Sequence, residues 1–268
     1  MLVAAPLGGA NSLSLNAYTV AGDPRSPRRV ALIHSLAMDR EFWRPVAQRL
    51  DAAVLLYDCT GHGASPKAPG PYTVEGFAED LAQLLDHLGW DAALVAGASM
   101  GGCVGLAFAA RYPERVSSLG LVDATACYGN PKAWEERAQK ALHEGLQALV
   151  DFQVTRWFGE AFRAQHPDVV SQCVARFVSN DVRAYAQACR MLGAADLRSA
   201  LPRIEVPTAI VVGEEDYATP LAMAQELHRG IRGSALTVLK GARHLTPLER
   251  PHEVADVLRR LLDTVAVA

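Results

Sequence analysis

The feature that most constrains the fold is a regular alternation between short apolar runs and stretches with helical periodicity. Most of the runs are almost continuously apolar, as expected for strands that helices cover on both faces of a sheet. Strands that alternate with helices are typical of parallel sheets with crossover helices. We therefore expect parallel strands at residues 29–34, 53–58, 92–98, 116–123, 208–213 and 235–240. A mixed polar and apolar segment at 13–20 predicts an edge hairpin.

The alternation is interrupted once, between residues 123 and 208. This stretch has no strand-like run but contains amphipathic pieces at 134–142, 146–158, 169–177 and 182–191. It is too long for an ordinary connection between two strands. We expect residues 130–200 to form a helical cap over the carboxyl edge of the sheet, where open α/β sheets bind their ligands. Residues 1–129 and 201–268 would form the core domain.

Composition narrows the range of partners. Lys and Arg number 26 against 29 Asp and Glu, giving a net charge of −3, which does not suit nucleic acid as a partner. The five cysteines form no CxxC pair, and this favours a reducing compartment over a disulfide scaffold or a zinc ribbon. The first residues lack the basic segment of a secretory signal. We expect a cytoplasmic protein.

One uncharged window, residues 92–110, has the length of a membrane span. Glycines at positions 97, 101, 102 and 105 interrupt it. A buried strand, a tight turn and a buried helix explain this window better than a membrane span does. We therefore expect no membrane association.

The sharpest chemical motif lies in that window, where Ser99 stands between Gly97 and Gly101 at the junction of a predicted strand and a predicted helix. A serine on such a strained turn is forced outward, and the glycines let the backbones cross closely. The N-terminus of the following helix offers its dipole and free N–H groups to a developing oxyanion. The context predicts a nucleophile rather than a structural turn serine.

A serine hydroxyl needs a base and an orienting acid to act as a nucleophile near neutral pH. His244 is the candidate base, because it lies in the loop just after the last predicted strand. Three carboxylates, those of Glu214, Glu215 and Asp216, follow the preceding strand. Asp123, which ends an earlier strand, is a further alternative. The chemistry of these residue types does not separate the candidates.

The order of serine, acid and histidine is that of α/β-hydrolases, and the chain resembles this family over almost its whole length. Four motifs carry the resemblance: residues 58–65, 97–102, 213–216 with the later Pro220, and 241–244. The resemblance implies an α/β-hydrolase fold, with a mostly parallel eight-stranded sheet flanked by helices. It also implies that Asp216 is the acid and that His62 is structural.

The same resemblance implies an oxyanion hole built from two backbone N–H groups. One belongs to Met100, the residue after the nucleophile, and the other to Leu36, two residues after the histidine that follows the first parallel strand. Most members have glycine where this chain has Ser35. Epoxide hydrolases and haloalkane dehalogenases use an aspartate nucleophile, so Ser99 argues against both.

Within the family, the chain resembles 3-oxoadipate enol-lactonases and related esterases, on residues 34–36, 42–43, 97–102, 122–126, 134–137, 156–158 and 194–198. This implies a serine hydrolase that cleaves a small carboxylic ester or enol-lactone through an acyl-enzyme, without a metal or an organic cofactor. Three alternatives stay open: a carbon–carbon bond hydrolase of aromatic catabolism, a cofactor-free perhydrolase, and a ligand receptor on a hydrolase scaffold.

The predicted cap offers candidate substrate-binding residues. Trp134 and Arg137 lie three apart on a predicted helix and could present an apolar wall and a carboxylate clamp on one face. In the alternative interpretation, Trp134 packs against the core domain and Arg137 is solvated. Trp157, Phe158 and Phe162 would line an acyl pocket or form the core of the cap itself. Both interpretations stay open, as does a homodimer.

Overall fold

The computed structural model describes residues 15–265, whose strands form one sheet in the order β1-β3-β2-β4-β5-β6-β7. The strands are β1 (Tyr18–Ala21), β2 (Arg29–Ile33), β3 (Ala53–Tyr57), β4 (Ala93–Ala98), β5 (Val116–Val122), β6 (Thr208–Gly213) and β7 (Ala235–Leu239). Only β1 runs antiparallel to its neighbour, while the other pairs in this part of the chain are parallel. All six predicted parallel strands are therefore present.

The predicted sheet and the observed one differ at the edge. The resemblance implied eight strands, and the described residues contribute seven. Of the edge hairpin predicted at 13–20, the described residues form one strand, β1, which pairs with β3 at the edge of the sheet. Residues 13 and 14 of that hairpin lie outside the described residues.

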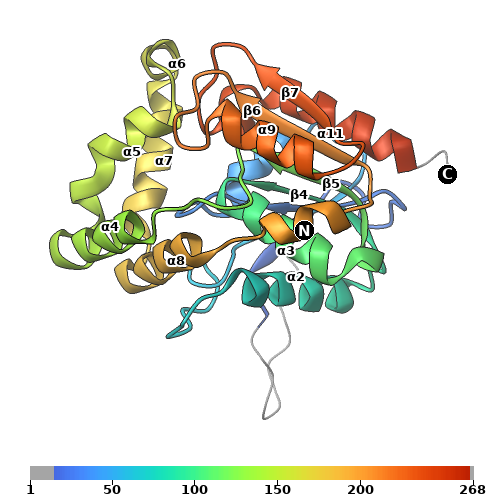
Figure 1. The fold of residues 1–268 in the computed structure, drawn as a ribbon, viewed down its shortest axis with the longest axis horizontal. Helices are drawn as coiled ribbons and strands as arrows, with labels where there is room; N and C mark the ends of the chain where they lie inside the picture. The colour runs from blue at the N-terminus through green and yellow to red at the C-terminus, as the bar shows by residue number, and fades with distance from the viewer. Residues whose placement is uncertain (1–14, 266–268) are drawn as a thin grey trace.

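Helices cover both faces of the sheet (Figure 1). One face carries α2 (Val74–Leu88), α3 (Met100–Arg111) and α9 (Leu221–Gly230), and the other carries α1 (Arg44–Ala47) and α11 (Pro251–Val265). Short helical turns η1 (Arg40–Trp43), η2 (Pro113–Arg115), η4 (Arg198–Arg203) and α10 (Thr246–Glu249) join these elements. This two-sided cover explains why all six residues of β4 are buried and apolar or glycine.

Between β5 and β6 the chain forms a group of helices that lies to one side of the sheet (Figure 1). They are α4 (Pro131–Glu144), η3 (Leu146–Leu149), α5 (Val150–Trp157), α6 (Glu160–Gln165), α7 (Pro167–Ser179) and α8 (Val182–Ala194). The amphipathic pieces predicted helices here, but α6 was not among them. The domain limits 130–200 for a cap stay a prediction.

Sheet topology determines where a site can form. Strands β2, β4, β5, β6 and β7 are parallel, so the loops that follow them leave the sheet at one edge. These loops carry residues 34–39, 99, 123–130, 214–220 and 240–245. Within residues 15–265, no helix combines the length and the hydropathy that crossing a membrane would require.

Candidate active site

Ser99 occupies a sharp turn between β4 and α3. Its backbone has φ 52° and ψ −116°, a left-handed conformation that is strained for a residue with a Cβ. The neighbouring backbones approach so closely that a Cβ on Gly97 would lie 2.0 Å from the Gly101 carbonyl oxygen, and one on Gly101 would lie 2.1 Å from that of Ile33. Glycine at both positions is therefore a steric requirement of the turn.

His244 reaches Ser99 from the loop after β7. Its Nε2 lies 3.0 Å from the Ser99 Oγ, so the hydroxyl donates to this nitrogen when Nδ1 carries the imidazole proton. The backbone N–H groups of His244 and Leu245 both donate to the carbonyl of Trp157, each at 3.1 Å. The loop that bears the imidazole is thus held by the end of α5.

Asp216 completes the chain of hydrogen bonds. Its Oδ2 accepts from the Nδ1–H of His244 at 2.8 Å and from the Thr219 hydroxyl at 2.8 Å, while Oδ1 accepts from the backbone N–H groups of Ala218 and Thr219 at 2.7 and 3.0 Å. Burial by itself would raise the pKa of Asp216. His244 and the Thr219 donors outweigh it and hold this pKa below its usual value, which keeps the carboxylate ionised.

The other carboxylates considered from the sequence contact other groups. Glu214 accepts from the Gly241 N–H at 2.9 Å, and Glu215 lies 3.3 Å from the Arg243 guanidinium. Asp123 is fully buried and accepts hydrogen bonds from Gly213 and Thr246. Of the four candidates, the structure brings Asp216 to the imidazole.

A small cavity of about 20 Å³ lies beside the Ser99 hydroxyl, with room for one water-sized molecule. Leu36 lines it, and within residues 15–265 its N–H donates to no protein acceptor. Met100 begins α3, and the first N–H groups of a helix have no intrahelical partner. The role of these two N–H groups in an oxyanion hole stays a prediction.

Three residues near Ser99 were not predicted as site residues from the sequence. Tyr128, in the loop after β5, places its hydroxyl 3.4 Å from the Ser99 Oγ. Gln153 and Arg156 of α5 line the cavity together with Trp157. Their spacing in the sequence was the one indication, because residues 153, 156 and 157 share one face of a helix, and Trp157 was a predicted site residue.

Trp134, Arg137 and Trp157, three of the five predicted cap residues, line this cavity. The other two, Phe158 and Phe162, are not among the residues that line it. Their rings stack on each other with centroids 5.0 Å apart, and both side chains are buried within the helical segment. The structure thus favours the alternative in which these two rings form the core of the cap.

Arg137 and Arg156 place two guanidinium groups at the cavity. Arg137 donates to the Tyr185 hydroxyl at 2.6 Å and lies over the Trp134 ring at 5.1 Å. Among the described residues, no carboxylate lies within ion-pair distance of either guanidinium. Burial, followed by the charge of Arg137, lowers the pKa of Arg156. Two cations therefore share a site that contains no paired anion.

Gln153 lies beside these cations. It is 2% exposed, and its side-chain oxygen has no hydrogen-bond partner among the residues that the structure describes. A buried polar atom without a partner is uncommon and costs stability.

The structure places no cluster of three or more His, Cys, Asp or Glu side chains arranged to hold a metal ion within residues 15–265.

A serine elbow at the carboxyl edge of a parallel sheet, with an imidazole and a carboxylate converging on it, is the arrangement of nucleophile-elbow hydrolases. Comparison with known proteins agrees with this class. The model of the alpha/beta hydrolase fold family matches residues 28–251. The chain belongs to this family.

Individual relatives include enol-lactonases and an esterase. The chain is 33% identical to 3-oxoadipate enol-lactonase 2 of Acinetobacter baylyi, over 94% of this chain and 95% of the relative. Its structure matches that of the enol-lactonase from Burkholderia xenovorans with a TM-score of 0.89 at 34% identity, covering 92% of this chain and 96% of the other. A thermophilic esterase from Thermogutta terrifontis, described with malate bound, matches with a TM-score of 0.87 at 31% identity and 93% coverage of both chains.

Proposed function

We propose that this protein is a serine hydrolase that cleaves a small carboxylic ester or enol-lactone through an acyl-enzyme. The observation that carries the proposal is the continuous path from the Ser99 hydroxyl through His244 to Asp216, with contacts of 3.0 and 2.8 Å. The relatives at 33% and 34% identity are named enol-lactonases and the one at 31% is named an esterase, which supports the same reaction class.

In the first half of the reaction, the Ser99 Oγ attacks the carbonyl carbon while His244 Nε2 takes the hydroxyl proton. The carbonyl oxygen becomes an oxyanion, which the N–H groups of Leu36 and Met100 stabilise. Each such donor contributes about 3 kcal/mol in comparable sites. Asp216 holds the imidazole with Nδ1–H toward itself and stabilises the cation that forms.

Collapse of the tetrahedral intermediate breaks the bond from carbonyl carbon to alkoxy or enol oxygen, and His244 returns its proton to that oxygen. In a lactone, the leaving oxygen stays attached to the acyl group. In the second half, His244 activates a water molecule, which attacks the acyl carbon. The acid is then released as the proton returns to the Ser99 Oγ.

The substrate we propose carries a carboxylate in addition to the scissile ester. Arg137 and Arg156 supply positive charge at the cavity without a carboxylate partner of their own among the described residues, and Gln153 adds a buried polar group. Guanidinium groups suit carboxylates because their N–H donors form charge-assisted pairs. The malate bound in the related esterase, a dicarboxylate, is consistent with this substrate class.

The substrate would approach through the neighbouring surface hollow. This hollow has a volume of about 430 Å³ and shares Tyr128, Trp134, Arg137 and Arg156 with the catalytic cavity. The catalytic cavity is much smaller, about 20 Å³. We therefore propose that side chains at this shared wall shift when the substrate binds, since a small ester needs more room than one water molecule.

The nucleophile is tested with Ser99→Ala and p-nitrophenyl acetate. We expect kcat to fall by about 10⁶, the effect of removing the nucleophile in a comparable serine enzyme. A Ser99→Ala variant that hydrolyses the ester at a rate near that of the wild type would refute the proposal. Steady-state turnover of the wild type beyond one equivalent would separate an enzyme from a receptor.

The carboxylate is tested with a pair of substrates of similar size, p-nitrophenyl hemisuccinate and p-nitrophenyl butyrate. In Arg156→Gln we expect kcat/KM for the hemisuccinate to fall about 10- to 100-fold, with a much smaller change for the butyrate, because only the charged ester loses an ionic hydrogen bond. The exposed Arg183→Gln variant controls for net charge. An equal loss for both esters in Arg156→Gln contradicts the assignment.

We further propose that the enzyme works in the cytoplasm. Its cysteines are all unpaired, at positions 59, 103, 127, 173 and 189, and all but Cys127 are buried. Unpaired cysteines are typical of reducing compartments. Fractionation of the producing cells, with an antibody to this protein, tests the location, and recovery outside the cytoplasm would overturn it.

A further inference from the structure

The loop that carries Leu36 is fastened to the core at both ends. At its start, the His34 Nε2 accepts from the backbone N–H of Cys59 at 2.9 Å, and the His34 Nδ1–H donates to the Ser35 carbonyl at 2.8 Å. At its end, the backbone N–H of Arg40 donates to the Asp58 carboxylate at 2.7 Å. The residues between these two points depend on other contacts for their conformation.

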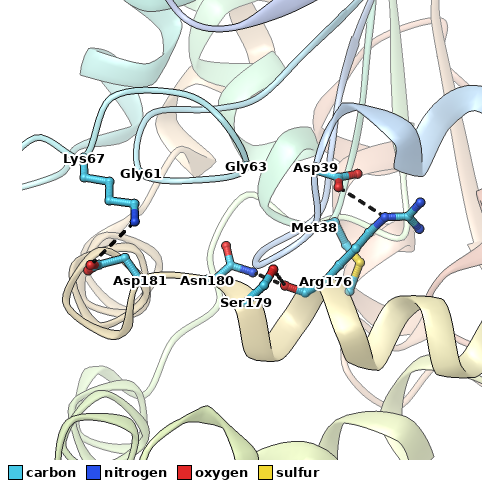
Figure 2. Close-up of a pocket in the computed structure, with 9 residues that line it drawn as sticks. All are labelled: Met38, Asp39, Gly61, Gly63, Lys67, Arg176, Ser179, Asn180 and Asp181. Atoms are coloured by element: carbon cyan, nitrogen blue, oxygen red, sulfur yellow. Dashed lines mark hydrogen bonds and ion pairs between the residues drawn. The ribbon is translucent and has the colours of Figure 1, made fainter.

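The group of helices between β5 and β6 supplies those contacts, from the end of α7. Asn180 Nδ2 donates to the Ala37 carbonyl at 2.9 Å, and Arg176 Nε lies 3.2 Å from Asp39 Oδ2. Figure 2 shows the Arg176 side chain pointing toward Asp39, with Asn180 nearby. Arg176 and Asn180 both line a small cavity of about 40 Å³. Two residues one helical turn apart therefore hold two points of one loop.

The loop needs this support because of its backbone conformation. The Met38 N–H donates to the Ser35 carbonyl at 3.1 Å and closes a four-residue turn, in which Ala37 has φ 59°. Positive φ at the third residue of a turn favours glycine, because a Cβ is crowded there. Ala37 is completely buried, so this left-handed conformation is maintained by its surroundings.

Asn180 binds the peptide group that matters most for this turn. The Ala37 carbonyl, which accepts from Asn180, and the Met38 N–H, which closes the turn, belong to the same peptide unit. If this unit rotates, the turn opens and releases the Ser35 carbonyl, whose peptide unit carries the Leu36 N–H. The same Asn180 nitrogen also contacts the carbonyls of Arg176 and Phe177, at 2.7 and 3.2 Å, so its position follows the end of α7.

We propose that Asn180 is a positioning residue that couples the docking of α7 to the formation of the oxyanion hole. This inference rests on the proposed function, in which the Leu36 N–H stabilises the oxyanion. Asn180 touches neither Ser99 nor His244, and it acts through the turn 35–38. Arg176 assists from the other end of the loop through its ion pair with Asp39.

A nearby pair provides the matched control. Lys67 and Asp181 line the same small cavity, and the Lys67 Nζ lies 4.0 Å from the Asp181 carboxylate oxygen. Within the described chain, Lys67 forms no hydrogen bond to the turn 35–38. Its side chain is 57% exposed, and exposed ion pairs contribute little to stability. Lys67→Ala therefore changes the cavity and its charge without changing the loop that carries Leu36.

The test measures kcat and KM for p-nitrophenyl acetate, a small neutral ester that does not need the arginine pair. Asn180→Asp has the same shape but lacks the N–H donors. We expect its kcat to fall about tenfold, with KM within about twofold, because a shift of the oxyanion donor affects the transition state more than the ground state. Lys67→Ala should keep both values within about twofold of the wild type.

A glycine rescue distinguishes positioning from a general loss of structure. In Ala37→Gly the left-handed turn no longer crowds a Cβ, so adding Asn180→Asp should lower kcat by less than about threefold. A full tenfold loss in the glycine background, or an unchanged kcat in Asn180→Asp, would overturn the inference. If Asn180→Asp does not fold, Arg176→Gln is tested in its place, both alone and together with Ala37→Gly. An unchanged kcat in Arg176→Gln, or a full tenfold loss in the glycine background, would then overturn the inference.

These outcomes are separable from failure of the proposed function. A fluorophosphonate probe labels an activated serine, and its rate of reaction with Ser99 is measured in each variant. No Ser99-dependent labelling or turnover in the wild type refutes the proposed function itself. Normal labelling and turnover in the wild type, together with an unaffected Asn180→Asp variant, refutes only the role of Asn180.

Discussion

The carboxylate of Asp123 accepts both the backbone N–H and the hydroxyl of Thr246, at 3.0 and 2.7 Å, although the two residues lie 123 positions apart. Its other oxygen accepts from the Gly213 N–H at 3.1 Å. Gly213 precedes the loop of Asp216, and Thr246 follows that of His244. Asp123 therefore joins the two loops that carry the proposed acid and base.

Replacing Asp123 should weaken the fold and the site together. Asp123→Asn keeps the size of the side chain but exchanges one acceptor oxygen for a donor, which leaves at least one buried backbone N–H without a partner. We expect the free energy of unfolding to fall by about 1–3 kcal/mol, with a parallel loss of kcat. Urea unfolding and ester hydrolysis measure these effects. Unchanged stability would contradict the joining role.

The choice among the acid candidates gives a second prediction. Asp216→Asn should lower kcat by about 10⁴, the loss seen when the orienting aspartate of a comparable triad becomes asparagine. Glu214→Gln is the matched control, because in the described part of the chain Glu214 accepts only from the Gly241 N–H and a glutamine oxygen can do the same. Equal losses in the two variants would rule out Asp216 as the acid.

The elbow predicts opposite outcomes for two glycines of α3. A Cβ on Gly101 would lie 2.1 Å from the Ile33 carbonyl oxygen, so Gly101→Ala must displace backbone. We expect it to cost about 3 kcal/mol of unfolding free energy or more. A Cβ on Gly105 would meet its nearest atoms at 3.7 Å, so Gly105→Ala should change stability by less than about 1 kcal/mol and toward greater stability. Thermal unfolding of both variants decides the comparison.

Two buried histidines predict acid sensitivity. Burial lowers the pKa of His34 from 6.5 to about 4 and that of His62 from 6.5 to about 3. Since the unfolded chain binds these protons at higher pH than the folded one, stability is fully present above about pH 6.5 and declines as the pH falls from there toward 4. Each histidine contributes a slope of about 1.4 kcal/mol per pH unit in that window.

The variant His62→Asn tests this origin of the slope. It should remove roughly half of the decline in unfolding free energy between about pH 6.5 and 4.5, because one of the two buried titrating groups is gone. The exposed His143→Asn variant is the control. A decline as steep in His62→Asn as in the wild type would show that other groups cause the acid sensitivity.

Local patterns in the sequence predicted most of the fold. The six parallel strands follow from continuous apolar runs, and α4, α5, α7 and α8 follow from the amphipathic pieces between residues 123 and 208. The serine elbow was also predictable, because its glycines are a local steric requirement. The helix α6 was not predicted, since six residues are too few to establish a periodicity.

The composition of the site was less predictable. Gln153 and Arg156 lie on an amphipathic helix whose polar residues gave no indication of which face meets Ser99. Tyr128 lies in an irregular loop, and its distance of 3.4 Å from the serine hydroxyl depends on the path of β5. Phe158 and Phe162 are aromatic residues for which the sequence left a pocket wall and the cap core both open, and the stacking of their rings became visible only in the structure.

The sequence by itself determined the local elements and the residue types of the chemistry, because strand and helix periodicity, turn sterics and motif order are properties of neighbours along the chain. Only the tertiary structure decided that Arg156 lines the cavity at Ser99 and that Asn180 binds the loop that carries Leu36, and it brought Asp216, the acid that the family resemblance implied, to His244. Those outcomes depend on the directions of side chains from segments far apart in the sequence. Direction is set by the packing of whole elements, which no short stretch encodes.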